Sequence, residues 1–276
     1  MLTIFKTVLM MSGLGFCLTA LLLILKPVTS KRFPAKWQYY AWIAVLVFML
    51  VPVWRFIPQK QASSIIHPQQ TAVQDVLSGT QELTHVQNTE NVINNDVPIE
   101  YKEIRPFGKA VKILDFLACI WLCGMCVFLL VVIVSYAVYL RSKRKNAVTL
   151  LDNAVLEKVK AELGIKRRIS LRMSSDIKSP LLCGVLFPVV YLPCTPISDD
   201  MLRMVFLHEL THYKRKDLII KWLAVFVNAV HWFNPLAYLL TANVGEACEI
   251  SCDMDVTRDM DEAEQRLYMR TILDLV

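Results

Sequence analysis

Three long apolar blocks constrain this chain more than any other feature of its sequence. They lie at about residues 2–25, 37–57 and 113–140. A helix needs near 20 apolar residues to cross about 30 Å of hydrocarbon, and each block has roughly that length. Because 55% of the 276 residues are hydrophobic, the composition also favours an integral membrane protein over a soluble domain. A cleaved signal peptide is the weaker interpretation of the first block, since Lys6 is the only charge near its start.

Basic residues at the ends of these blocks predict the orientation, because short loops rich in Lys and Arg stay on the cytoplasmic side. Two such clusters follow the first and third blocks: Lys26, Lys31, Arg32 and Lys36, and Arg141, Lys143, Arg144 and Lys145. The polar segment at about 58–105 is then an outward-facing loop. The sequence therefore predicts a multi-pass protein of the cell membrane, with residues 1–140 forming three transmembrane helices and the N-terminus outside. These clusters also account for the net charge of +6, so direct nucleic-acid binding is not expected.

Residues 141–276 are predicted to form a cytoplasmic-facing domain of mixed structure. Apolar residues recur at helical spacing from Thr149 to Leu163. The apolar patterns at 168–173 and 181–192 indicate two or three short strands, one of them an exposed edge. Ser198 is placed to cap a helix that has Asp199 and Asp200 in its first turn and runs through Met201 to about Lys214. The expected fold class is mainly α, a polytopic membrane protein with a small α+β domain.

The helix capped by Ser198 carries the pattern HELTH, which begins at His208. Residues four apart share one face of a helix, so His208 and His212 can bind one cation while Glu209 reaches a water molecule beside it. Zn²⁺ accepts imidazole nitrogen and activates water at neutral pH. The alternative is a surface helix with two satisfied histidines, but chance seldom produces HExxH in a chain with five histidines. The pattern therefore predicts a zincin-like site with Glu209 as the catalytic base.

A catalytic zinc normally takes a third protein ligand. Glu249 in the segment CEISCD is the preferred candidate, and Asp253 lies one helical turn later, where it can accept the spare N–H of a ligating histidine. Glu246 shares a helical face with Glu249 and is the alternative ligand. His231 lies in an apolar and aromatic stretch, where packing is the expected role.

The position of Glu249 constrains the apolar segment at about 218–244. If this segment crossed the membrane as a fourth span, Glu249 and His208 would lie on opposite sides. The part before Asn234 is roughly 20 Å long as a helix, which is short of a span. We therefore expect a membrane-associated helical hairpin that turns at Asn234 and Pro235 and returns Glu249 to the cytoplasmic side. A true fourth span is the alternative.

Four segments in order resemble a known family: PLLCGVLFPVVYLP, HELTHYKRKD, HWFNPLAYL and CEISCD. They are similar to the BlaR/MecR-type antirepressor family of integral-membrane zinc metallopeptidases, and the likeness covers essentially the whole chain. The resemblance implies a gluzincin site in which zinc is held by His208, His212 and Glu249. It further implies Glu209 as general base, Asp253 in support, and cytoplasmic proteolysis that relays an outside signal to inactivate a transcriptional repressor of the antibiotic-resistance type.

The resemblance also implies the partners. These are a protein substrate, either a winged-helix repressor or the chain itself, together with the lipid bilayer and a second copy in a homodimer. Antibiotic-sensing members carry a further span and an outward penicillin-binding sensor domain, which the likeness does not include, so β-lactam sensing is not expected from these residues. The alternatives are a housekeeping membrane protease without a dedicated repressor and a non-catalytic membrane sensor. The intact HExxH pattern favours an enzyme, because a sensor has no need for Glu209.

Overall fold

The computed structural model describes residues 2–52, 107–150 and 153–275. Three helices come first: α1 (Leu2–Arg32), α2 (Ala35–Phe48) and α3 (Phe107–Lys145). By length and composition, α1 and α3 are long and apolar enough to cross a membrane. Helix α2 has 14 residues, which is short for a span. The end of the second apolar block and the predicted loop at 58–105 lie outside the described residues, so the three-span arrangement stays a prediction.

A small four-stranded sheet follows α3, with the strand order β1-β2-β4-β3. Its strands are β1 (Ala147–Leu150), β2 (Ser170–Ser174), β3 (Leu181–Cys183) and β4 (Val189–Pro193). The central pair β2 and β4 is parallel, and β1 and β3 add to it antiparallel on either side. Strand β3 therefore forms one edge of this sheet. The sheet has one strand more than predicted, because β1 was missed.

The predicted helix from Thr149 to Leu163 is wrong at its start. Thr149 lies in β1, where it pairs with β2, and the helix α4 spans Ala154–Glu162. The side chain of Asn153 accepts a hydrogen bond from the backbone N–H of Leu156 and begins the helix at that point. Thr149 and Leu150 therefore lie in a strand rather than at the start of the expected helix.

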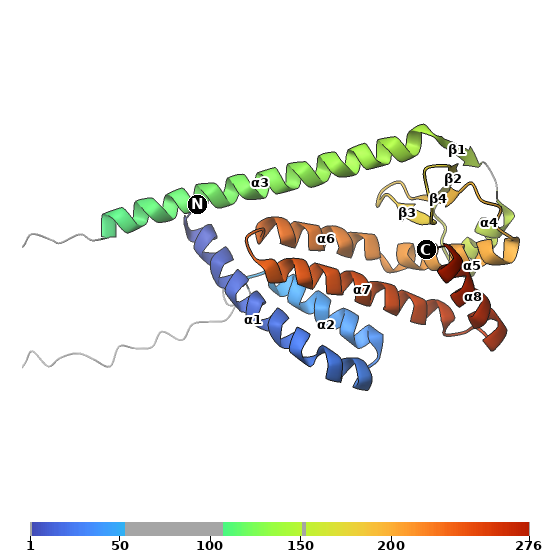
Figure 1. Cartoon of the computed structure of the whole chain (residues 1–276), viewed down its shortest axis with the longest axis horizontal. Helices are drawn as coiled ribbons and strands as arrows, with labels where there is room; N and C mark the ends of the chain where they lie inside the picture. The colour runs from blue at the N-terminus through green and yellow to red at the C-terminus, as the bar shows by residue number, and fades with distance from the viewer. Residues whose placement is uncertain (1, 53–106, 151–152, 276) are drawn as a thin grey trace, which may run out of the picture.

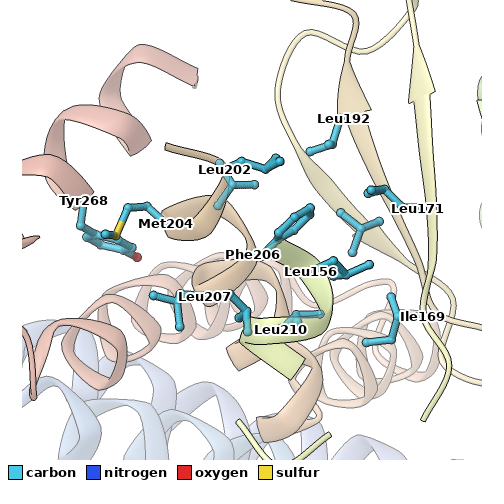
Figure 2. Packing of buried hydrophobic residues seen from close by; sticks show 13 residues of the cluster. Leu156, Ile169, Leu171, Leu192, Leu202, Met204, Phe206, Leu207, Leu210 and Tyr268 are labelled. Atoms are coloured by element: carbon cyan, nitrogen blue, oxygen red, sulfur yellow. The ribbon is translucent and has the colours of Figure 1, made fainter. Parts of the chain in front are cut away.

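Helix α5 (Asp199–Arg215) carries the HELTH pattern through the centre of the domain. Its start is confirmed, since the Ser198 side chain accepts from the backbone N–H of Met201. Figure 2 shows Phe206 pointing toward the sheet and α4, while Met204 points toward Tyr268 of α8 (Glu262–Leu275). Because Phe206 and Leu210 are fully buried, α5 is fixed between these elements. Its histidines lie on a separate face of the helix.

Helices α6 (Asp217–Val230) and α7 (Pro235–Thr257) run side by side in opposite directions (Figure 1). The chain reverses at Asn234, whose side chain accepts from the backbone N–H of Leu236 and donates to the Ser12 hydroxyl of α1. A buried apolar cluster, with Leu46 of α2 and Leu240 of α7 among its members, joins the pair to α2. The second half of α7 thereby returns to the end of the molecule that holds the sheet. Membrane association of this pair stays a prediction.

Candidate metal centre

Helix α5 brings the two histidines of HELTH together. Their Nε2 atoms are 3.2 Å apart, and their side chains are almost buried. Because the residues are four apart on a helix whose opposite face is packed in the core, their separation is set by the backbone. The two nitrogens are therefore presented as a pair toward one point.

Helix α7 adds a carboxylate to this pair. Oε2 of Glu249 lies 3.1 Å from Nε2 of His212 and 3.6 Å from Nε2 of His208. Ligand atoms held tetrahedrally at zinc, with bonds of about 2.0–2.1 Å, are separated by about 3.3 Å. The three atoms have this spacing, so His208, His212 and Glu249 fit a zinc ion with one coordination position left open.

The two alternative third ligands lie elsewhere. Glu246 forms an ion pair of 2.7 Å with Lys26 at the end of α1. His231 is buried at the turn between α6 and α7, where its Nε2–H donates to the carbonyl oxygen of Met49 over 2.9 Å. Neither side chain faces the histidines. Of Glu249, Glu246 and His231, only Glu249 is brought to the Nε2 atoms of the two histidines.

The other ring nitrogen of His208 faces Asp253, as predicted from spacing. Nδ1 lies 3.2 Å from Oδ1 of Asp253 and 2.7 Å from the hydroxyl of Tyr268. The Tyr268 hydroxyl itself donates to Asp253 over 2.6 Å. A carboxylate on the far nitrogen fixes the ring orientation and makes the near nitrogen a better metal ligand. Tyr268 was missed because α8 reaches the site through packing, which no short pattern predicts.

Asp217 holds the other ring of the pair and was also missed from the sequence. The Nδ1–H of His212 donates to Oδ2 of Asp217 over 2.8 Å. This carboxylate also accepts from the Tyr39 hydroxyl over 2.9 Å and pairs with Nε of Arg215 at 3.1 Å. Lys216 adopts a left-handed conformation with φ of 63° and ends α5, which turns Asp217 back toward the histidine. A carboxylate directly after the basic run of HELTHYKRKD was the available signal.

The carboxylates around His208 and His212 favour positive charge on the two imidazole rings. Burial opposes protonation of His208, but hydrogen bonds to Asp253 and Glu249 outweigh burial and raise its pKa to about 9. The pKa of His212 is raised in the same way by Asp217. Burial acts against ionisation of Glu249, yet both histidines hold its pKa well below the ordinary range. A divalent cation can replace the two imidazole protons, so the electrostatics of the site agree with its geometry.

Glu209 lies beside the ligand set and lines the same pocket of about 170 Å³. Burial raises its pKa, while the neighbouring His208 and His212 lower it to a smaller extent. The pocket is also lined by Leu181 and Leu182 of the edge strand β3. A carboxylate with a raised pKa next to an open coordination position is placed to accept a proton from water.

Three further side chains, one on α6 and two on α7, lie near Glu249. Lys221 donates to its second oxygen, Oε1, over 2.8 Å. Cys248 and Cys252 lie on either side of Glu249 in the sequence and within 4.8 Å of histidine ligand atoms. Burial raises the pKa of the Cys252 thiol, and its Sγ contacts the His208 carbonyl oxygen at 3.7 Å. Glu249 completes the candidate set with both histidine Nε2 atoms, at 3.1 and 3.6 Å.

An HExxH helix that receives a glutamate from a second helix, joined to apolar helices of spanning length, is the arrangement of a membrane metallopeptidase. A family model described as BlaR1 peptidase M56 matches residues 6–276. The chain belongs to this family, which confirms the resemblance recognised from the motifs.

Curated relatives cover the chain at moderate identity. Regulatory protein BlaR1 of Bacillus licheniformis is 32% identical over 160 residues, which are 56% of this chain and 26% of that protein. Methicillin resistance mecR1 protein of Staphylococcus aureus is 25% identical over 238 residues, 84% of this chain and 39% of that protein. Regulatory protein BlaR1 of Staphylococcus aureus is 25% identical over 282 residues, which are 97% of this chain and 45% of that protein. The chain thus spans less than half the length of these relatives.

Proposed function

We propose that this chain is a zinc metalloendopeptidase that cleaves peptide bonds at the cytoplasmic face of the cell membrane. The observation that carries the proposal is the convergence of His208 Nε2, His212 Nε2 and Glu249 Oε2 at tetrahedral spacing. Glu209 borders the same pocket. The basic clusters after the first and third apolar blocks support a cytoplasmic location of this site.

The chemistry divides between the metal and the chain's own side chains. Zinc held by the two histidines and Glu249 would polarise the scissile carbonyl and lower the pKa of water. Glu209 takes the proton from the attacking water and passes it to the leaving amine, a contribution of typically about 10² to 10⁴ in rate. Asp253 and Asp217 keep both imidazole rings oriented through their Nδ1 atoms.

The edge strand β3 is the place where a substrate would bind. Leu181 and Leu182 line the pocket, and β3 pairs with β4 on its other side. An extended peptide that pairs with the outer edge of β3 gains main-chain hydrogen bonds and passes beside Glu209. This mode of binding selects an unfolded or flexible segment of a protein rather than a folded surface.

Family membership supports a regulatory protein as the biological substrate. The relatives are named as regulatory and methicillin-resistance proteins, which supports signal transduction rather than general protein turnover. We propose that cleavage inactivates a winged-helix transcriptional repressor, with the chain itself as a second substrate. Metal dependence and peptide cleavage can be tested before either substrate is identified.

Three matched glutamate variants of the full chain, reconstituted in lipid vesicles, test the site. Glu209→Gln is expected to keep its zinc and lose at least about 100-fold of its cleavage rate, because it loses a proton acceptor without losing a ligand. Glu249→Gln is expected to lose zinc and cleavage together. Glu246→Gln is the control on the same helix, and it should keep both. Zinc is measured by elemental analysis, and cleavage by mass spectrometry of the chain and of an added repressor.

The outcomes separate the assignments. Near wild-type cleavage by Glu209→Gln would remove Glu209 from the mechanism. Full zinc occupancy in Glu249→Gln would exclude Glu249 as the third ligand. Cleavage of the chain itself without cleavage of the repressor would leave the peptidase assignment intact and reject the repressor as substrate.

A further inference from the structure

The turn between β3 and β4 exposes large apolar side chains that no part of the proposed site uses. Leu186 is 68% exposed and Phe187 is 82% exposed, and Val185 precedes them. We call Val185, Leu186 and Phe187 the hairpin tip. Its side chains point away from the core cluster of the sheet, in which Leu171 and Leu192 are buried.

The hairpin tip is held rigidly. Gly184 has φ of 84°, and a Cβ atom there would lie 2.4 Å from the carbonyl oxygen of Phe187, so the turn requires glycine. The guanidinium of Arg167 donates to the carbonyl oxygen of Leu186. The backbone N–H of Ser170 donates to the carbonyl oxygen of Pro188 over 3.1 Å. Phe187 is therefore exposed by a fixed turn rather than by a loose loop.

The hairpin tip borders a pocket that it shares with α3, at the level where the apolar run of α3 ends. Phe187 lines one pocket with Leu140 and Arg141, and Leu140 is the last apolar residue before the basic cluster. Figure 1 shows the β3–β4 turn beside the end of α3 nearest the sheet. If α3 spans the membrane, the boundary between hydrocarbon and water falls at this level. Exposed Leu and Phe side chains at this depth are stabilised by the lipid interface.

The same pocket, of about 410 Å³, combines an apolar wall with positive charge. Three arginines line it: Arg141 and Arg144 from α3 and Arg172 from β2. No acidic side chain is among its lining residues, and among the described residues none of the three guanidinium groups forms an ion pair. Nε of Arg172 is buried without a hydrogen-bond partner in the described structure. The nearby Asp176 is engaged by Lys143 and Asn146.

We propose that the hairpin tip inserts into the cytoplasmic interface of the membrane and that the arginine pocket binds the phosphate of an anionic phospholipid. Guanidinium groups pair with phosphate oxygens, and the apolar wall of Phe187, Val189 and Tyr191 borders the start of the acyl chains. The occupant is a lipid because the pocket continues directly from the apolar surface of α3. The hairpin tip follows β3, and β3 also lines the pocket of Glu209. Insertion of the tip therefore also fixes the distance between that pocket and the membrane.

Photo-cross-linking tests the insertion of the tip. The full chain carries p-benzoylphenylalanine at position 187 and is reconstituted in vesicles of phosphatidylcholine and phosphatidylglycerol. Mass spectrometry after irradiation is expected to find phospholipid adducts at position 187. Position 273 of α8 is the control, because Leu273 is 79% exposed and α8 contributes no residue to the arginine pocket, so it should yield none. Adducts at 187 to a second protein chain alone, or no excess over position 273, would overturn the proposal.

Native mass spectrometry of the detergent-solubilised chain tests the pocket. The wild type should retain phosphatidylglycerol more tightly than phosphatidylcholine. The variant Arg144→Gln with Arg172→Gln should lose affinity for phosphatidylglycerol by about fivefold for each arginine removed. The control, Arg266→Gln with Arg270→Gln on α8, should match the wild type.

Two results would count against the pocket. Equal retention of both lipids by the wild type would overturn it even if the arginine variants do not fold. Displacement of phosphatidylglycerol by glycerol phosphate at equal concentration would show that the pocket binds a free phosphate and does not require a lipid. Circular dichroism of each variant establishes that it is folded before its affinity is compared.

Discussion

The two histidines of the candidate centre are held by carboxylates in different surroundings. Asp217, which holds His212, has a side chain that is 1% exposed, whereas the side chain of Asp253, which holds His208, is 44% exposed. The first carboxylate is joined to Tyr39 of α2, in the apolar bundle. The second is joined to Tyr268 of α8, at the end of the described chain. One imidazole is thus fixed from the bundle and the other from the outer domain.

This difference in exposure decides how readily water can replace a lost hydrogen-bond partner of Asp217 or of Asp253. A buried carboxylate interacts strongly with its donors and has few substitutes, so removal of its charge leaves donors unsatisfied. A half-exposed carboxylate exchanges one partner for water at a small cost. We therefore expect the His212 side of the site to be the less tolerant one. The bundle and the candidate ligand set are joined by hydrogen bonds through Asp217, so the helices are connected directly to His212.

The largest expected effect is that of Asp217→Asn. Both carboxylate oxygens accept hydrogen bonds, from Tyr39 and from His212 with Arg215, and an amide offers only one acceptor oxygen. The amide NH₂ of the new asparagine must then face one of these donors, and this repulsion disturbs the His212 ring. Zinc affinity, measured by competition with a chromophoric chelator, is expected to fall by about 10- to 100-fold. Asp253→Asn is the matched variant on the other side and should lose only a few-fold; a reversed order would contradict the comparison.

A smaller effect concerns protons released on metal binding. The pKa of His208 in the metal-free chain is about 9, above its ordinary value, so the ring is protonated at neutral pH. A protonated imidazole cannot bind zinc, and His212 has a raised pKa as well. Zinc affinity should therefore decrease as pH falls, by about tenfold per pH unit for each proton displaced. Calorimetry in two buffers of different protonation enthalpy should show release of about two protons at pH 7.

Asp253→Asn sharpens this measurement. Removal of the carboxylate lowers the pKa of His208 toward its ordinary value and leaves the raised pKa of His212 in place. The variant should therefore release close to one proton fewer at pH 8 than the wild type. An unchanged proton count would show that Asp253 does not control the ionisation of His208.

Local spacing in the sequence predicted the parts of this site that lie within one element. The HELTH helix, its Ser198 cap and the reversal near Asn234 depend on neighbours a few residues apart, and the structure has all three. Glu249 was chosen by helical spacing to Asp253, and the structure brings it to the histidines, although its role as a metal ligand stays a prediction.

Features that depend on long-range contacts were missed. Strand β1 has four residues and exists because it pairs with β2, more than 20 positions later. Asp217 reaches His212 because Lys216 adopts a left-handed conformation, which is uncommon for lysine, so the carboxylate after the basic run did not by itself predict this contact. Tyr39 and Tyr268 arrive from helices far along the chain in either direction. Packing between elements decides such contacts, and periodicity within an element carries no information about them.

The smallest expected effects, those of Tyr39→Phe and Tyr268→Phe, test the comparison most finely. Loss of the Tyr39 hydroxyl leaves Oδ1 of buried Asp217 with only the long hydrogen bond of 3.4 Å from Nε of Arg215, and a poorly satisfied buried acceptor costs about 1–3 kcal/mol. Loss of the Tyr268 hydroxyl lets Nδ1 of His208 turn to Asp253, 3.2 Å away, while water reaches the half-exposed carboxylate. Thermal unfolding of the full chain should therefore show the larger decrease in Tm for Tyr39→Phe, with zinc affinity of both variants within about threefold of the wild type. Equal decreases would mean that burial of Asp217 does not distinguish the two sides of the site.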